Sequence, residues 1–324
     1  MGNACKELEL VLFADDTNIF AQEREPVALF NKVNQGLQNL GSWFRCNKLT
    51  LNLKKTEYVF FGGPKAKNAE GLGLSVGEEE VRRVNGVKFL GTWVDERLRW
   101  TEQVSKVKRK VSQLLGVLGR AKAVLDGNSL RVLYNSLVLP HLQYCLMVWG
   151  DFSGDCNGSL GKNILSVQKR LVGMIDGKTG RYHADPLFAK HGILKVEDLY
   201  RQQLRVHAWK FWNNCLPPSQ AAMLEKVSQI HGHGTRLASR GMFVSTRDHK
   251  QVGYKLPKEW EALPGALRGA SSLGAFKRQS KDAFLGGYGQ FACAVGGCYV
   301  CGDLSESQRG AAVLEPQEMP DIGE

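Results

Sequence analysis

Two adjacent carboxylates, Asp15 and Asp16, interrupt an apolar segment near the start of the chain. The run Leu10–Phe13 before them is apolar throughout, which is typical of a strand buried on both faces. Apolar residues resume in Thr17–Ala21, so the pattern predicts two strands joined by an acidic hairpin turn. Paired carboxylates can hold divalent metal for phosphoryl chemistry. Asp is also common in turns because it bonds the local backbone, and the dipeptide alone leaves both interpretations open.

The segments that follow would position this hairpin. Pro26 is favoured in a first helical turn, and it opens a helix whose apolar residues recur with a period near 3.6: Leu29, Phe30, Val33, Leu37, Leu40 and Phe44. The polar segment Asn52–Thr56 comes next, and then a predicted strand at Tyr58–Gly62. A further strand-rich segment covers Val84–Asp95.

This succession resembles the reverse transcriptases of non-long-terminal-repeat retrotransposons, the LINE-like group that includes jockey and CR1 elements. Phe13-Ala14-Asp15-Asp16 matches their metal-binding palm hairpin, and Asn52-Leu53-Lys54-Lys55-Thr56 matches their Asn-x-x-Lys-Thr motif. Lys88-Phe89-Leu90-Gly91 followed by Val94-Asp95 matches their primer-grip region. The resemblance continues downstream and spans roughly residues 8–288. One departure is Gln103, which stands where such elements often have His.

The resemblance implies a role for each motif. Asp15 and Asp16 would bind Mg²⁺, with Asp15 as ligand and Asp16 as a nearby or auxiliary carboxylate. Lys55 would neutralise charge on the leaving group or donate a proton, although a solvated lysine is the alternative. Lys88, Phe89, Leu90 and Gly91 would hold the primer end, or they form an ordinary core strand. The implied partners are an RNA template, a DNA primer and deoxynucleoside triphosphates.

The family's fingers and the palm strand with its first metal-binding Asp are expected far upstream of Asp15. Each Mg²⁺ ion takes about six ligands, so we expect this polypeptide alone to be a poor or inactive polymerase. A truncated reverse transcriptase is the first hypothesis for its function. The alternative is a non-enzymatic, basic nucleic-acid-binding protein derived from such an element.

Charge supports a polyanionic partner. The chain has 43 Lys plus Arg against 32 Asp plus Glu, a net charge of +11, and such a surplus is typical of nucleic-acid contact. The densest basic cluster lies on a helix predicted from Thr101 to about Leu125, with an apolar stripe beneath it. Its members are Lys106, Lys108, Arg109, Lys110, Arg120 and Lys122. The cluster would contact duplex phosphates, or it is simply a solvated face.

The predicted fold class is α+β: a truncated polymerase palm, made of a small antiparallel sheet with helices, followed by a mostly helical thumb and a helical C-terminal region. We assign the palm to residues 1–100, the thumb-like region to 101–180 and the C-terminal region to 181–290. Residues 291–324 are expected to form a disordered acidic tail. Loss of the upstream strands would leave Leu10–Phe13 at a sheet edge. Loops are predicted at Asp151–Gly158, around His231-Gly232-His233 and over Pro257–Gly269, and Trp209, Phe211 and Trp212 are assigned to the core.

Eight scattered cysteines form no disulfide framework, which favours a reducing compartment. Cys293, Cys298 and Cys301 could begin a zinc site, but no His follows them, so reduced tail cysteines are favoured. No secretory signal or membrane-spanning segment is predicted, and the start Met1–Lys6 matches a myristoylation signal only in part. An intracellular protein of nucleus or cytoplasm is expected, and the sequence does not indicate an oligomeric state.

Overall fold

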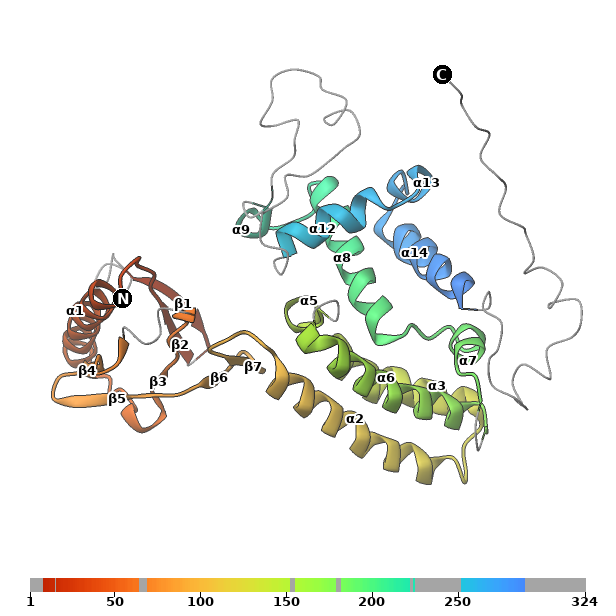
Figure 1. Ribbon diagram of the computed structural model, residues 1–324, viewed down its shortest axis with the longest axis horizontal. Coiled ribbons are helices and arrows are strands. Elements are labelled where there is room, and N and C mark those ends of the chain that lie inside the picture. Colours follow the sequence, from red (N-terminus) through yellow and green to blue (C-terminus); the bar gives the residue numbers. More distant parts are fainter. Residues whose placement is uncertain are drawn as a thin grey trace, which may run out of the picture. The chain divides into compact units, whose positions relative to one another are not determined.

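The computed structural model describes residues 8–14, 16–63, 69–151, 155–178, 182–221, 224 and 252–288 (Figure 1). The chain divides into two compact units, Met1–Gln103 and Val104–Glu324. The first unit combines strands with one long helix, and the second is helical in its described part. The predicted α+β class is therefore confirmed. The assignment of palm, thumb and C-terminal regions stays a prediction.

Unit 1 contains three small sheets among its described residues. Strand β1 pairs with β2, β4 pairs with β5, and β6 pairs with β7, all antiparallel, whereas β3 pairs with β5 in parallel. The elements are β1 (Glu9–Phe13), β2 (Asp16–Phe20), α1 (Pro26–Cys46), the 3₁₀ turn η2 (Leu53–Lys55), β3 (Glu57–Tyr58), β4 (Leu74–Val76), β5 (Glu79–Arg83), β6 (Gly86–Phe89) and β7 (Thr92–Asp95). The strand predicted over Tyr58–Gly62 is thus short and begins one residue earlier.

Helix α1 supplies most of the core of unit 1. It begins at Pro26 as predicted, and Phe30, Leu37 and Leu40 are buried on one face. The helix lies against β4 (Figure 1), where Asn34 bonds twice. Its Nδ2 donates to the Gly73 carbonyl at 3.0 Å, and its Oδ1 accepts from the Ser75 N–H at 3.0 Å. A short apolar stripe and one amide side chain thus hold this helix on the strand.

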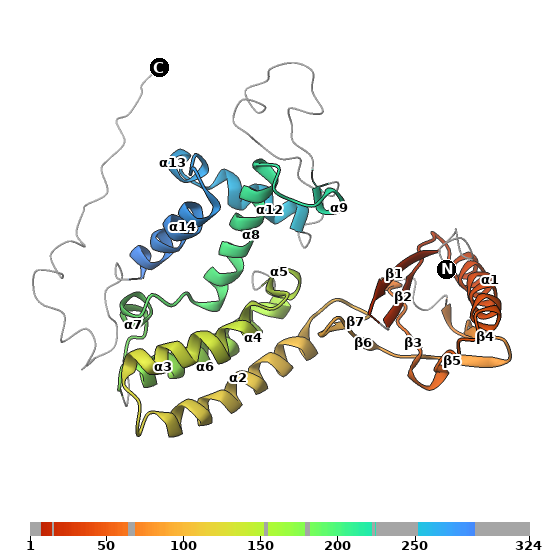
Figure 2. The same cartoon turned by 180° about the vertical axis from the view of Figure 1, so that it is seen from behind.

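Unit 2 begins within α2 (Thr101–Ala121), and Figure 2 shows its elements from the opposite side. Helix α2 ends four residues before the predicted Leu125, and its predicted stripe is confirmed because Val104, Val107, Val111, Leu115 and Leu118 are buried. The other elements are α3 (Gly127–Leu133), the π-helical turn η4 (Tyr134–Val138), α4 (Leu139–Gln143), α5 (Leu146–Trp149), α6 (Asp155–Ile175), α7 (Asp185–Lys190), α8 (Val196–Trp212), α9 (Pro218–Ala221), α12 (Val252–Glu261), α13 (Gly265–Arg268) and α14 (Leu273–Gly287).

The π-helical turn η4 has a cause in the sequence. The buried residues Leu130, Tyr134, Val138, Leu142 and Leu146 recur every four positions. In an α-helix of about 3.6 residues per turn, such a repeat drifts around the helix axis. The wider π turn compensates for that drift between Leu130 and Leu142, whereas Leu146 follows a break in the helix at Tyr144 and Cys145. The interior then includes Gln168 of α6, whose amide bonds the Tyr134 hydroxyl, the Leu194 carbonyl and the Val196 N–H at 2.8, 2.8 and 3.0 Å.

Helix α8 is the central element of unit 2. It contacts α4, α5, α6, α12 and α14, and Figures 1 and 2 show it running between α6 and the C-terminal helices. Its residues Trp209 and Phe211 are buried in a cluster with Leu256, Trp260 and Phe276, while Trp212 packs on that cluster. The predicted core role of the three aromatic residues is therefore confirmed.

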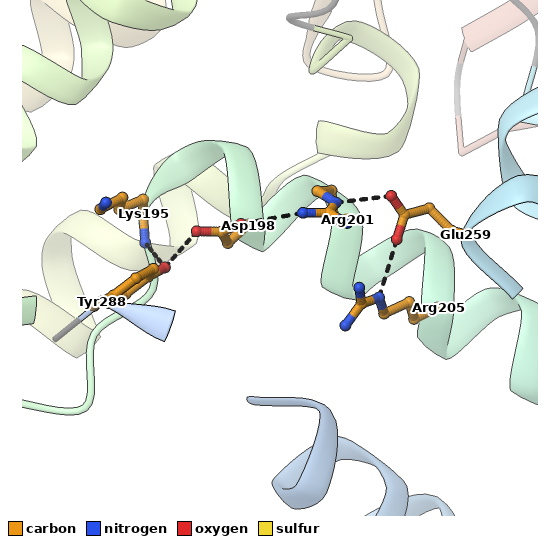
Figure 3. Close-up of polar contacts among 6 residues, drawn as sticks. All are labelled: Lys195, Asp198, Arg201, Arg205, Glu259 and Tyr288. Atoms are coloured by element: carbon orange, nitrogen blue, oxygen red, sulfur yellow. Dashed lines mark hydrogen bonds and ion pairs between the residues drawn. The ribbon is translucent and has the colours of Figure 1, made fainter. Parts of the chain in front are cut away.

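Charged side chains on α8 fasten the C-terminal helices (Figure 3). Glu259 of α12 accepts from Arg201 Nε at 2.7 Å and from Arg205 Nε at 3.0 Å. At the end of α14, the Tyr288 hydroxyl donates to Asp198 at 2.5 Å and accepts from the Lys195 N–H at 3.1 Å. Burial, reinforced by the bond to Asp198, raises the pKa of Tyr288. The network joins three helices without leaving its charges unpaired.

Two loop predictions in unit 2 are wrong in part. Pro257 lies inside α12 rather than in a break, because Leu256, Pro257 and Trp260 are buried together. Helix α6 begins at Asp155, within the loop predicted over Asp151–Gly158.

Several other predictions fall outside the described residues. They concern the zinc candidates Cys293, Cys298 and Cys301, the His231–His233 loop, and the acidic tail. Within the described part of the chain, no helix combines the length and apolarity needed to cross a membrane.

Candidate functional site

The β1–β2 hairpin carries the acidic motif. Its register pairs Phe13 at the end of β1 with Asp16 at the start of β2, and Ala14 lies in the turn between them. Ala14 has a φ of 52°, a left-handed conformation that costs a non-glycine residue about 1–2 kcal/mol. A positive φ at the first turn residue is what tight hairpins with primed turns require. Asp15 itself lies outside the described residues.

The burial predicted for Leu10–Phe13 is wrong at the tip of the hairpin. Leu12 is 58% exposed and Phe13 is 61% exposed, while Leu10 and Val11 are half-buried. The physical reason is that β1 pairs only with β2 among the described strands. No second strand or helix therefore covers the outer end of this sheet in the described part of unit 1.

Asp16 begins β2 and is exposed. Its carboxylate has no hydrogen-bond or ion-pair partner among the described residues. Carboxylate oxygens are the ligand type that Mg²⁺ prefers, so the donor chemistry of the hairpin fits that ion. Among the described residues, no group of three or more His, Cys, Asp or Glu side chains could hold a metal. Metal binding by Asp15 and Asp16 stays a prediction.

Lys55 lies at the end of η2, and the motif around it forms a closed turn. The Lys55 N–H and the Thr56 hydroxyl both donate to the Asn52 carbonyl at 3.0 Å. Thr56 therefore fixes the turn through its side chain, which explains why a hydroxyl residue suits the last position of the motif. The Lys55 side chain is exposed and contacts no described carboxylate. No described contact joins Lys55 to Asp16.

The segment Lys88–Gly91 forms a second hairpin tip rather than a continuous strand. Lys88 and Phe89 end β6, and Leu90 and Gly91 form a two-residue turn that closes on Thr92. Both turn residues have positive φ, 44° for Leu90 and 85° for Gly91. This is the type I′ pattern, which matches the twist of the flanking strands. Glycine at the second position avoids strain, whereas Leu90 does not.

An aromatic contact brings the two hairpins together. Phe20 at the end of β2 meets Phe89 at the end of β6, with ring centroids 5.8 Å apart and planes at 88°. Edge-to-face packing of this kind stabilises by about 0.5–1.5 kcal/mol beyond area burial. The contact lies at the end of the β1–β2 hairpin where Phe20 pairs with Glu9, opposite the turn that carries the acidic motif.

The basic helix α2 presents its charges away from the core. Arg109 and Lys110 are exposed, whereas Lys106 and Lys108 are half-buried. Lys106, Arg109 and Lys110 follow a helical i, i+3, i+4 spacing and share a face, while Lys108 flanks the opposite side. Lys108, Arg109 and Lys110 form no ion pair with a described residue. Arg109 and Lys110, exposed cations on one face, suit contact with phosphate groups.

Two polar residues next to the β6–β7 hairpin were not assigned a role from sequence. Asp95 accepts hydrogen bonds from the N–H groups of Arg97, Arg99 and Trp100. Gln103 is buried, with 6% exposure, and its Oε1 accepts from the Trp93 N–H at 2.9 Å. An Asp at the end of a strand followed by a short loop is a sequence signal for such backbone bonding. The buried amide of Gln103 leaves no comparable signal.

Comparison with known proteins gives one distant relationship. No family model matches the chain, and no solved structure matches it. A curated relative, the "Probable RNA-directed DNA polymerase from transposon X-element" of Drosophila melanogaster, is 23% identical over 172 residues, which is 52% of this chain. The matched region is only 18% of that relative's length. This similarity supports a relationship between the chain and transposon reverse transcriptases.

Proposed function

We propose that this chain is part of the RNA-directed DNA polymerase of a non-long-terminal-repeat retrotransposon, and that it contributes the Asp-Asp hairpin and a duplex-binding surface. The observation that carries the proposal is the β1–β2 hairpin, whose turn residue Ala14 has a left-handed φ and whose opposite end contacts Phe89 through Phe20. A non-glycine residue in a left-handed conformation is a form of backbone strain that clusters at functional sites. The relationship to a transposon polymerase supports the same reading.

The residues would divide the work of nucleotidyl transfer. Asp15 and Asp16 would hold Mg²⁺, which when bound supplies charge stabilisation at the attacking and leaving oxygens. Lys55, exposed and without a described carboxylate partner, would neutralise the leaving group or give it a proton. The Phe89–Gly91 turn would support the primer end. Arg109 and its neighbours on α2 would bind duplex phosphates.

We further propose that the 324-residue polypeptide alone is a poor polymerase, because two carboxylates cannot supply about six ligands to each of two ions. The test is primer extension on an RNA template with Mg²⁺. Little or no extension is expected from the isolated chain, and robust synthesis would overturn this part. If synthesis occurs, Asp15→Asn should abolish it while leaving duplex binding intact.

Duplex binding tests the α2 surface separately. Replacing Lys106, Arg109 and Lys110 by Gln should weaken binding and lower the slope of log affinity against log salt by about one per lost phosphate contact. The matched control replaces Lys162, Lys169 and Arg170 on α6 by Gln; these three residues are exposed, and their replacement removes the same charge. Equal losses in both variants would mean that net charge, and not the α2 face, binds the duplex.

A non-enzymatic nucleic-acid-binding protein is the second candidate. The observation that favours it is that α2 carries basic residues outside a buried apolar stripe. Phosphate binding by these residues needs no metal ion. Salt-dependent duplex binding by the Asp15→Asn and Asp16→Asn variants, with no synthesis by any variant, would favour this candidate over the enzyme.

A further inference from the structure

A backbone N–H on the outer edge of the β6–β7 hairpin donates a hydrogen bond to a side chain. Phe89 and Thr92 close the two-residue turn, so the next pair, Lys88 and Trp93, is the non-hydrogen-bonded kind. The Trp93 N–H therefore points away from β6. Gln103, two residues inside α2, accepts that N–H through Oε1 at 2.9 Å, and the Gln103 side chain is buried.

The connection between β7 and α2 is ordered by a second side chain. Asp95 ends β7, and its Oδ1 accepts from the N–H groups of Arg97 and Arg99, both at 3.1 Å. Its Oδ2 accepts from the Trp100 N–H at 2.8 Å. Leu98 and Trp100 have positive φ, at 51° and 60°. One carboxylate thus holds a loop whose backbone would otherwise favour other conformations.

These bonds leave the hairpin little freedom relative to the first turn of α2. Asp95 fixes the loop, and Gln103 joins its far end back to β7. A buried N–H that loses its acceptor destabilises that arrangement, because no water replaces the bond. The position therefore needs a side chain that is long enough, uncharged and able to accept a hydrogen bond.

We propose that Gln103 is a positioning residue, which holds the Lys88–Gly91 hairpin in its nucleic-acid-binding orientation by accepting the Trp93 N–H. The inference rests on the proposed function, since it names a residue that acts through the hairpin and not on the nucleic acid. Gln103 touches the backbone of β7, so its effect on a bound duplex is indirect.

The experiment compares Gln103→Met with Gln103→His in the full chain. Met has similar length but accepts no comparable hydrogen bond. A neutral imidazole accepts one and an imidazolium does not, so the His variant carries its own switch, at a pH below the ordinary His pKa of about 6.5 because the position is buried. The controls are Gln35→Met and Gln35→His, at an exposed position of α1 in the same unit. Two readouts are taken: the protection factor of the Trp93 amide in hydrogen exchange, and the affinity for an RNA–DNA primer–template duplex.

The expected results are specific to a hydrogen-bond acceptor. Gln103→Met should lower the Trp93 protection factor about fivefold to tenfold, the loss expected for one net hydrogen bond, and should weaken duplex binding in step. Gln103→His should match the unmutated chain at pH about 8, where the imidazole is neutral, and should approach the Met variant only as pH falls below the lowered pKa of the buried imidazole. The Gln35 variants should change neither readout over this pH range.

Each failure has a distinct meaning. Unchanged Trp93 protection in Gln103→Met, or a His variant that does not restore protection at pH about 8, would overturn the positioning role. Lost protection with unchanged duplex affinity would also overturn it, because the bond would then be structural only. Absence of salt-dependent duplex binding by the unmutated chain would instead refute the proposed function, while the amide readout would still report on the bond.

Discussion

The two units hold their elements in place by different means. In unit 2, the buried residues include Trp149, Trp260 and Tyr134, each 1% exposed or less, and a charged network fastens three helices. In unit 1, the core is a few side chains around α1, and much of the remaining order comes from single side chains that bond the backbone, such as Asn34 and Asp95. Unit 2 is thus stabilised mainly by a large buried core, whereas the candidate site residues of unit 1 lie on turns with few packing contacts.

This difference predicts how substitutions in each unit should change stability. Apolar burial stabilises a unit as a whole, because the contacts are shared among many neighbours. A side chain that bonds the backbone of a turn fixes one local conformation, and its loss opens that turn first. Variants of unit 2 should therefore change global stability, and variants of unit 1 should change local order.

The largest contrast is expected from aromatic truncation. Trp260→Ala should destabilise unit 2 by about 4–5 kcal/mol, because the residue is 1% exposed and packs on Trp212 and Phe276. Phe30→Ala in unit 1 should cost less, about 3 kcal/mol, because its neighbours Tyr58 and Phe60 are only half-buried and can close the cavity. Denaturant titration followed by hydrogen exchange in each unit measures both. A larger cost for Phe30→Ala would contradict the comparison.

A second contrast concerns amide side chains. Gln168 is fully buried and makes three bonds, so Gln168→Leu leaves the Tyr134 hydroxyl, a carbonyl and an N–H unpaired. We expect a loss of about 3 kcal/mol. Asn34→Leu also breaks two bonds, but near the surface, where water can replace them, and should cost about 1 kcal/mol. Urea unfolding of the two variants measures both losses of unfolding free energy. Equal losses would show that burial does not make the amide of unit 2 more important than the amide of unit 1.

The pH dependence of stability should also differ between the two units. The bonds from Lys190 and His191 outweigh the effect of burial and lower the pKa of Asp176, whose side chain is 5% exposed. The folded chain then binds this proton less tightly than the unfolded chain. Stability from Asp176 is present above the unfolded pKa of about 3.9 and is lost as pH falls through the lowered folded pKa.

Asp176→Asn should therefore flatten the acid limb of the stability profile of unit 2. The matched control in unit 1 is Glu23→Gln. The pKa of Glu23 is also lowered, through its bond to Lys32, but that pair is exposed to solvent and salt. An exposed pair of this kind contributes little. A profile that keeps its full acid slope in Asp176→Asn would exclude the carboxylate as the cause.

The sequence predicted long periodic elements well. The stripes of α1 and α2 and the start at Pro26 follow from helical periodicity and from the fixed φ of proline. Pro257 misled the same reasoning, because packing of Leu256 and Trp260 outweighed the lost helical bond. Local signals thus identify elements, while tertiary packing decides their exceptions.

The candidate site was predicted as motifs rather than as geometry. The Asp-Asp hairpin and the Asn52–Thr56 motif are local, so sequence identifies them, and their chemical roles stay predictions. The exposure of Leu12 and Phe13, the Phe20–Phe89 contact and the Trp93–Gln103 bond depend on which strands and helices meet. Residue type and spacing do not predict these tertiary contacts, because a buried amide and a solvated amide look alike in sequence.

The smallest expected effect lies at the turn of the β6–β7 hairpin. Leu90 has a φ of 44° beside Gly91, and Asn-Gly is the dipeptide that type I′ turns favour. Leu90→Asn should therefore stabilise the hairpin by about 0.5 kcal/mol, since relief of strain is partly offset by lost apolar burial. Hydrogen exchange of the β6 and β7 amides would detect a change of this size. Leu285→Asn, at a half-buried position within α14, is the control; it should destabilise, because the same loss of burial there relieves no strain. If both variants destabilise equally, Leu90 is held by packing and its conformation is not a strained feature of the turn.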